Sequence, residues 1–130
     1  QQWTVIGPSN IASSSVDKIV VAVSNEAARP IAVECMDDSY IASYDVAFNK
    51  AYTVVALKMS TITLKALSQP GQSLYGIQFT NNGRIVIFGG GVPLTRGETI
   101  IGGFGVSGGT AEQDTKLGEY AKQCFESMTN

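Results

Sequence analysis

The segment from Ile87 to Asp114, IFGGGVPLTRGETIIGGFGVSGGTAEQD, contains nine glycines, and three of them are consecutive at Gly89–Gly91. A glycine inside a strand or helix costs about 0.5–1 kcal/mol relative to alanine. Glycine is therefore expected where the backbone turns with positive φ, or where another group approaches the main chain closely. The segment predicts either tightly packed chain reversals or bare backbone beside a ligand.

Before this segment, the spacing of apolar residues predicts helices and one strand. Apolar residues from Val16 to Ala27 recur at helical spacing, which predicts a first helix capped by a serine among Ser13–Ser15. The Arg29-Pro30 pair would stop that helix. The alternating segment PIAVECM, Pro30–Met36, predicts a strand.

Two more helices are expected before residue 72. The first starts near Ser43 and has an apolar face that includes Ala47, Ala51 and Val54. A shorter one is capped by Ser60 or Thr61 and stopped by Pro70-Gly71.

The spacing then changes to that of strands. The segments SLYGIQFT and GRIVIFGG flank Asn81–Gly83 and predict a hairpin, because Asn and Gly tolerate positive φ. The segment ETIIGGFGVSG predicts a third strand, joined to the hairpin by GVPLTRG. A final helix opens at Thr110, which forms a capping box with Gln113.

This order of elements predicts a single α+β domain over residues 1–130, with residues 1–12 as an N-terminal tail. Helices that segregate from a run of strands are typical of an antiparallel sheet flanked by helices.

Charge and composition limit the classes of partner. The net charge is −2 and only 15% of the residues are charged, with no cluster of Lys or Arg. This distribution argues against nucleic acid or an anionic membrane as partner. Apolar runs such as Ile19–Val23 are too short to span a membrane. A rather apolar surface favours burial against further copies of the chain.

The chain has no histidine and only two cysteines, Cys35 and Cys124. A Ser-His-Asp triad, a His-ligated zinc and a His-ligated haem are therefore excluded. The cysteines lie far apart with no CxxC motif, and the N-terminus lacks the pattern of a secretory signal. We expect reduced thiols in a cytoplasmic protein.

Four segments in order resemble the GlcG/HbpS family, and the likeness extends from Val16 to Phe125. They are KAYT (50–53), PGQSLYGI (70–77), GRIVIFGGGVPL (83–94) and IGGFGVSGGTAEQD (101–114). That family includes the C-terminal domain of PduO-type cobalamin adenosyltransferases. The resemblance implies a profilin-like α+β fold, homo-oligomers, haem binding or handling in some members, and an association with cobalamin-dependent metabolism in others.

The chain departs from the family pattern before its second predicted helix. Only Glu34 and Cys35 separate IAV from MDD, where family members have two strands and a turn. About ten residues of a hairpin therefore look missing, judged by ordinary hairpin length. Asp38 also stands where the family has glycine.

The candidate ligand contacts start with Lys50, Tyr52 and Thr53, which lie within one helical turn. Lys50 can pair with an acidic group of a ligand, and the hydroxyls can bond the ligand or ligate iron. The alternative is a solvated lysine beside a half-buried tyrosine.

The glycine-rich loops are the second set of candidates. Gly89, Gly90 and Gly91, with Pro93, would let a planar ligand or anion approach backbone N–H groups; the alternative is a packed chain reversal. Ser107, Gly108 and Gly109 precede a helix and would bind a carboxylate or haem propionate; the alternative is a capping box.

Possible soft ligands for iron are Met36, Met59, Met128, Cys35 and Cys124, although the last helix's Cys124 and Met128 fit core packing.

The leading hypothesis is an oligomeric accessory protein that binds haem or a related tetrapyrrole in glycolate, diol or glycerol metabolism. The alternatives are an enzyme acting on a small oxygenated metabolite and a structural oligomeric partner without a ligand. No residue is assigned a catalytic role.

Overall fold

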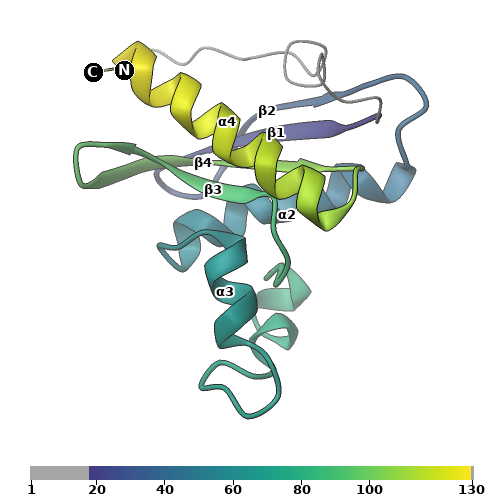
Figure 1. Cartoon of the computed structure of the whole chain (residues 1–130), viewed down its shortest axis with the longest axis vertical. Helices are drawn as coiled ribbons and strands as arrows, with labels where there is room; N and C mark the ends of the chain where they lie inside the picture. The colour runs from purple at the N-terminus through teal and green to yellow at the C-terminus, as the bar shows by residue number, and fades with distance from the viewer. Residues whose placement is uncertain (1–17, 130) are drawn as a thin grey trace.

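The computed structural model describes residues 18–129, which form a four-stranded antiparallel sheet with helices on both faces (Figure 1). The strand order is β2-β1-β4-β3. The predicted α+β class, an antiparallel sheet flanked by helices, is confirmed. The elements are β1 Val20–Asn25, β2 Pro30–Cys35, α2 Ile41–Ala56, α3 Thr61–Leu67, β3 Gly91–Arg96, β4 Thr99–Ser107 and α4 Ala111–Thr129.

The two central strands pair along their whole shared length, from Val20 opposite Ser107 to Asn25 opposite Gly102. β3 and β4 form the hairpin at one edge, with Gly91 opposite Gly105. β2 forms the other edge. The glycine-rich segment therefore supplies one edge strand, one central strand and the start of α4.

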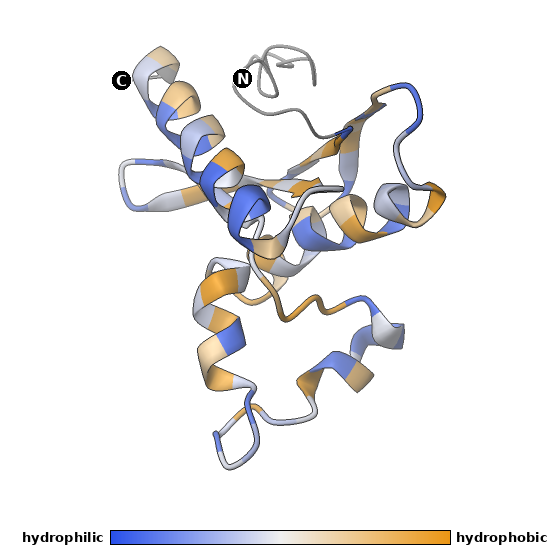
Figure 2. Cartoon of the chain, turned by 45° about the vertical axis from the view of Figure 1, so that its right-hand side comes forward, coloured by the Kyte–Doolittle hydropathy of each residue, from blue (hydrophilic) through white to orange (hydrophobic). Residues whose placement is uncertain are grey.

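The two faces of the sheet are packed differently. One face carries large side chains, among them Phe104 and Val106, which cluster with Leu117 and Phe125 of α4. The other face packs on α2 through small residues, such as Ala22 against Ala47. Figure 2 shows hydrophobic residues along the strands between the two helices, while several turns of α4 carry hydrophilic residues.

Glycine allows α2 to lie directly on the backbone of β4. A Cβ added at Gly103 would strike the Ala51 carbonyl oxygen, and one at Gly105 would strike the Ala47 carbonyl oxygen. Both obstacles are main-chain atoms of a helix and cannot rotate away. This close packing is the main reason for glycine in β4. Tight packing was one of the two explanations expected for the glycines.

α3 and residues 68–88 project from the α2 side of the sheet as a small lobe (Figure 1). The lobe contains two short 3₁₀ helices, Ile77–Phe79 and Asn81–Gly83. Ser60 caps α3 by accepting a hydrogen bond from the Thr63 N–H, as predicted. The other confirmed predictions are the strand at Pro30–Met36, the long second helix, the strand over ETIIGGFGVSG and the final helix.

The predicted first helix was wrong within the described residues, because Val20–Asn25 form strand β1. A short apolar run of this kind satisfies helical and strand spacing equally, and pairing with both β2 and β4 decides the outcome. The expected cap at Ser13–Ser15 and the tail at residues 1–12 lie outside the described residues.

The same error produced the apparent missing hairpin. β1, the turn at residues 26–29 and β2 together form two strands and a turn directly before Met36-Asp37. Nothing is lost from this edge of the sheet. Asp38 has φ 64°, so it adopts the left-handed conformation that glycine takes most easily.

The predicted hairpin around Asn81–Gly83 was also wrong. Asn81, Asn82 and Gly83 do adopt positive φ, but they belong to a 3₁₀ turn whose flanking segments are not strands. The real hairpin lies further along the chain. GVPLTRG, expected as a connection, is strand β3, and the chain reverses at Gly97-Glu98.

Candidate functional site

Lys50 lies at the centre of the region to which the sequence pointed. Its side chain is 0% exposed, and its ammonium donates to the Val106 carbonyl oxygen at 2.8 Å and to Asp114 Oδ2 at 3.2 Å. The ring centroid of Phe88 is 5.0 Å from the same nitrogen. The ammonium thus makes two hydrogen bonds within the protein and lies close to an aromatic ring.

Burial dominates the electrostatics of this lysine. Desolvation lowers the pKa of Lys50, and the carboxylate of Asp114 opposes that shift by attraction and by a hydrogen bond. Asp114 also accepts a hydrogen bond from the Gly109 N–H through Oδ1 at 3.0 Å. The carboxylate therefore connects α2 with the loop that enters α4.

Gly90 makes room for this ion pair. A Cβ at Gly90 would lie 2.7 Å from Lys50 Nζ, 2.7 Å from the Val106 carbonyl oxygen and 3.0 Å from Asp114 Cβ. Gly90 has φ 121°, and its carbonyl accepts a hydrogen bond from the Val106 N–H at 3.0 Å. The bare backbone at residue 90 is filled by the chain's own lysine.

The neighbouring glycines contact both α3 and α4. The Gly91 N–H donates to Thr61 Oγ1 at 2.9 Å. A Cβ at Gly89 would strike Thr115 Oγ1 and come within 3.4 Å of Ile62 Cδ1. Pro93 lies beyond them, half-buried on β3. Gly89 thus separates a side chain of α3 from one of α4.

The other two candidates on α2 point elsewhere. Thr53 is buried, where its hydroxyl donates to the Asn49 carbonyl oxygen and accepts from the Val86 N–H. Tyr52 faces the small lobe, where its hydroxyl donates to Asn81 Oδ1 and its ring stacks 3.8 Å from the Arg84 guanidinium carbon. Lys50, Tyr52 and Thr53 lie within one helical turn, but their side chains therefore do not converge on one site.

The start of α4 is capped by its own side chains. The Thr110 N–H donates to Gln113 Oε1 at 2.8 Å, and the Gln113 N–H donates to Thr110 Oγ1 at 3.1 Å, which is the predicted capping box. Before it, Ser107 is buried at the end of β4 and Gly108 has φ 122° against the Lys18 carbonyl oxygen. The Gly109 N–H that was proposed for an anion already donates to Asp114 Oδ1, and the Thr110 N–H beside it donates to Gln113 Oε1.

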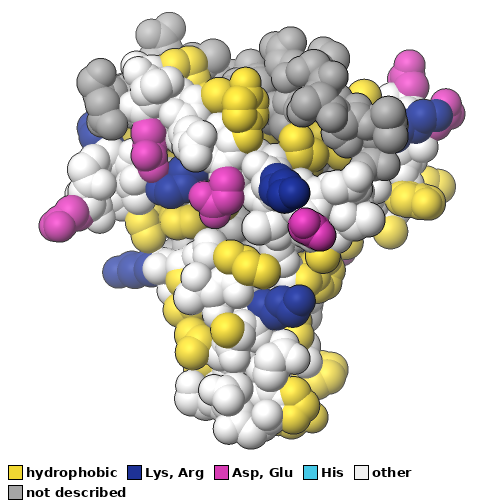
Figure 3. Space-filling model, viewed as in Figure 1, with side chains coloured by type: hydrophobic (Ala, Val, Ile, Leu, Met, Phe, Trp, Pro, Cys, Tyr) yellow, Lys and Arg dark blue, Asp and Glu magenta, His cyan; other side chains and the backbone are white. Residues whose placement is uncertain are grey.

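A groove of about 430 Å³ runs between α3 and the first turns of α4. Figure 3 shows basic side chains over α3 and over α4 on this face, with hydrophobic surface between them and acidic side chains beside those of α4. This groove was not predicted from the sequence, because its walls come from segments almost fifty residues apart. Its lining residues are Ile62, Lys65, Ala111, Glu112, Thr115 and Lys116.

The soft ligands are scattered. The sulfur of Met36 accepts a hydrogen bond from the Ile19 N–H at 3.4 Å, Cys35 is exposed on the edge strand, and Cys124 is half-buried on α4. Across residues 18–129 no group of three His, Cys, Asp or Glu side chains is arranged to hold a metal ion. No helix in this range has the length and apolar character needed to cross a membrane.

Comparison with known proteins gives a consistent result. Residues 9–123 match the model of the family described as haem degrading protein HbpS-like. The chain is 44% identical over 110 residues to an uncharacterized 15.0 kDa protein of the dhaT-dhaS intergenic region of Citrobacter freundii, covering 85% of this chain and 78% of that protein.

Two further matches involve PduO. The corrinoid adenosyltransferase PduO of Citrobacter freundii is 43% identical over 86 residues, which is 66% of this chain but only 26% of the enzyme. A crystal structure of a PduOC:haem complex superposes with a TM-score of 0.85 at 35% identity, covering 88% of this chain and 83% of that one.

Proposed function

Because the chain belongs to the family described as haem degrading protein HbpS-like, we propose that it is a small accessory protein that binds haem or a related tetrapyrrole. The similarity to the PduOC:haem complex, which extends over most of both chains, carries this proposal.

The residues of this chain fit the ring of a tetrapyrrole better than they fit its iron. A tetrapyrrole offers a flat apolar face and carboxylates, and the described surface has exposed aromatic side chains and separate lysines to meet them, including Phe88, which is 42% exposed. The chain has no histidine, so no imidazole of this chain can ligate the iron. When bound, haem would supply a redox-active iron.

Within this proposal Lys50 and Thr53 act as positioning residues. Both side chains are buried and engaged with other parts of the protein. The Lys50–Asp114 ion pair joins α2 to the start of α4 and packs directly against Gly90. Their effect on a ligand would pass through the position of the Gly89–Gly91 loop.

A hemin titration followed by visible absorbance tests the proposal. We expect a saturable Soret shift at one haem per chain or per small whole number of chains. Because the chain has no histidine, the spectrum of the complex should differ from that of a bis-histidine haem protein. A Soret band identical to that of free hemin at every protein concentration would overturn the proposal.

The metabolic setting is part of the same proposal. The relative between dhaT and dhaS and the partial match to a corrinoid adenosyltransferase support a role beside glycerol, diol or glycolate metabolism. Slower growth of a deletion strain on these carbon sources, restored by the gene, is the expected result. Unchanged growth on all three would contradict this setting.

A further inference from the structure

We propose that the groove between α3 and α4 is where this chain binds the carboxylate-bearing edge of its ligand, with Lys65 and Lys116 as the anion-binding side chains. The inference rests on the proposed function for the identity of the ligand, and it adds the site and the chemistry that recognises it.

The first support is the shape of the groove. Its volume of about 430 Å³ falls in the range of small-molecule sites, which is roughly 300–1,000 Å³. Ile62, Ala111 and the aliphatic stems of its lysines give it apolar walls. Ile62 and Thr115, which both line the groove, lie on either side of Gly89.

The second support is charge. Lys65 and Lys116 contribute two positive charges and Glu112 one negative charge, so the groove has a net charge of +1 in a chain whose net charge is −2. Glu112 lies 3.5 Å from Lys116, and both side chains are mostly exposed. Such an exposed ion pair contributes little to stability, so it can open and let Lys116 bind another carboxylate.

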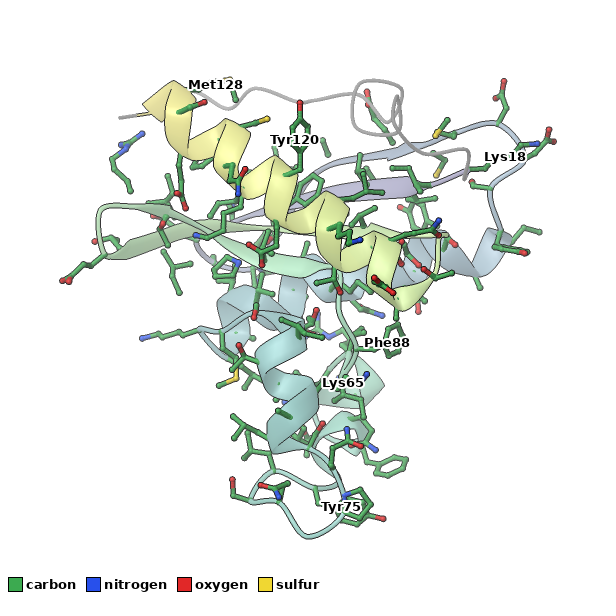
Figure 4. All side chains as sticks on the ribbon, viewed as in Figure 1. Lys18, Lys65, Tyr75, Phe88, Tyr120 and Met128 are labelled. Atoms are coloured by element: carbon green, nitrogen blue, oxygen red, sulfur yellow. The ribbon has the colours of Figure 1, made fainter. Side chains whose placement is uncertain are left out.

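The third support is the state of the helix terminus beside the groove. Asp114 and Gln113 already accept from the N–H groups of Gly109 and Thr110. These two N–H groups are therefore already engaged, and the lysine side chains supply the positive charge of the groove. Figure 4 shows Lys65 extending from α3 on the same side of the lobe as Phe88, whose ring also contacts Lys50.

The ligand class follows from these features. Two separated cations with apolar surface between them match a flat apolar molecule with carboxylates along one edge, as in a tetrapyrrole with propionates. A ligand of this size would leave part of the ring outside the groove, and Phe88 is positioned to shield it.

The test compares hemin binding by groove variants with binding by a matched control. The Lys65→Glu/Lys116→Glu double variant should bind hemin at least about tenfold more weakly, because attraction to two carboxylates becomes repulsion. Ala111→Trp should also weaken binding by filling the groove, and the exposed position of Ala111 makes the substitution compatible with folding. Lys18→Glu is the control, since the Lys18 side chain is exposed, pairs with Asp38 and does not line the groove (Figure 4).

A second arm isolates the carboxylates. Hemin dimethyl ester should bind the wild-type chain more weakly than hemin, and the double variant should not distinguish the two. Wild-type affinity for hemin in both groove variants would overturn the groove as the site while leaving the proposed function intact. An absent Soret shift in the wild-type chain would instead overturn the proposed function, and this inference with it.

Discussion

Lys50 is the residue on which the packing of this molecule depends most visibly. It is a fully buried cation whose partners are a carboxylate on α4 and a carbonyl on β4. A buried pair is weak evidence for stability when compared with apolar residues, but removal of one partner leaves an uncompensated charge. Lys50 therefore matters most through what its loss would do to Asp114.

We expect Lys50→Met to destabilise the chain by about 3–5 kcal/mol, because Met fills similar volume but leaves the Asp114 carboxylate buried without its cation. Lys50→Met/Asp114→Asn should recover part of that loss. Urea unfolding followed by circular dichroism measures both. A single variant within about 0.5 kcal/mol of wild type would show that the ion pair is dispensable.

The lowered pKa of Lys50 predicts a pH dependence with a definite sign. Between the lowered folded-state pKa and the ordinary value of 10.5, the unfolded chain binds more protons than the folded chain at this residue. Stability from this group therefore rises with pH across that window. The unfolding free energy of wild type minus that of Lys50→Met should increase from neutral pH toward 10.5. A decrease would mean that attraction to Asp114 outweighs desolvation.

At the scale of elements, the contact between α2 and β4 requires glycine. A methyl group at Gly105 would strike the Ala47 carbonyl oxygen and lie 2.8 Å from both the Ala51 nitrogen and Lys50 Cβ. We expect Gly105→Ala to cost about 1–3 kcal/mol, because α2 must move away from the sheet.

Gly118→Ala provides the matched comparison for that prediction. Its added methyl would lie 3.2 Å from the nearest heavy atom, the Gly90 carbonyl oxygen, and alanine favours the helix by up to about 1 kcal/mol. Its effect should stay within about 1 kcal/mol of wild type in the same unfolding assay. Equal effects of the two substitutions would refute the close-packing account of β4.

The elements that could be predicted from the sequence were those with strong local signals. The capping box at Thr110 located the start of α4, and the expected cap at Ser60 or Thr61 located the start of α3 to within one residue. β1 was mistaken for a helix because five apolar residues carry no decisive period, and only pairing with β2 and β4 selects a strand. At Asn81–Gly83 the prediction of positive φ was right, but the strands expected on either side of the turn were not formed.

The candidate site divides in the same way. Close approach to the glycine backbone was predictable from composition, yet the sequence could not tell a ligand from a buried lysine of the same chain. The residues of the groove, such as Ile62 and Lys65 on α3 and Thr115 on α4, come together only through tertiary packing. No spacing rule relates positions on separate elements.

At the scale of the whole molecule, the start of α2 exposes a cluster of apolar side chains. Ile41 is 97% exposed, Tyr40 is 74% exposed and Tyr44 is 52% exposed. Single exposed apolar residues need no explanation, but three within one turn of helix are typical of a protein interface. This cluster is a specific candidate for the contact that the predicted homo-oligomer requires.

We expect the wild-type chain to scatter light as a small multiple of its monomer mass, and Ile41→Lys/Tyr44→Lys to reduce that mass, because two lysines would have to be desolvated in the contact. Monomer stability should change by less than about 0.5 kcal/mol, since neither side chain is buried. Met128→Lys is the control. Met128 is as exposed as Tyr44, at 52%, but it lies at the end of α4 and outside the cluster. If the double variant keeps the wild-type mass, the contact lies elsewhere; if the wild-type chain is itself a monomer, the predicted homo-oligomer is wrong.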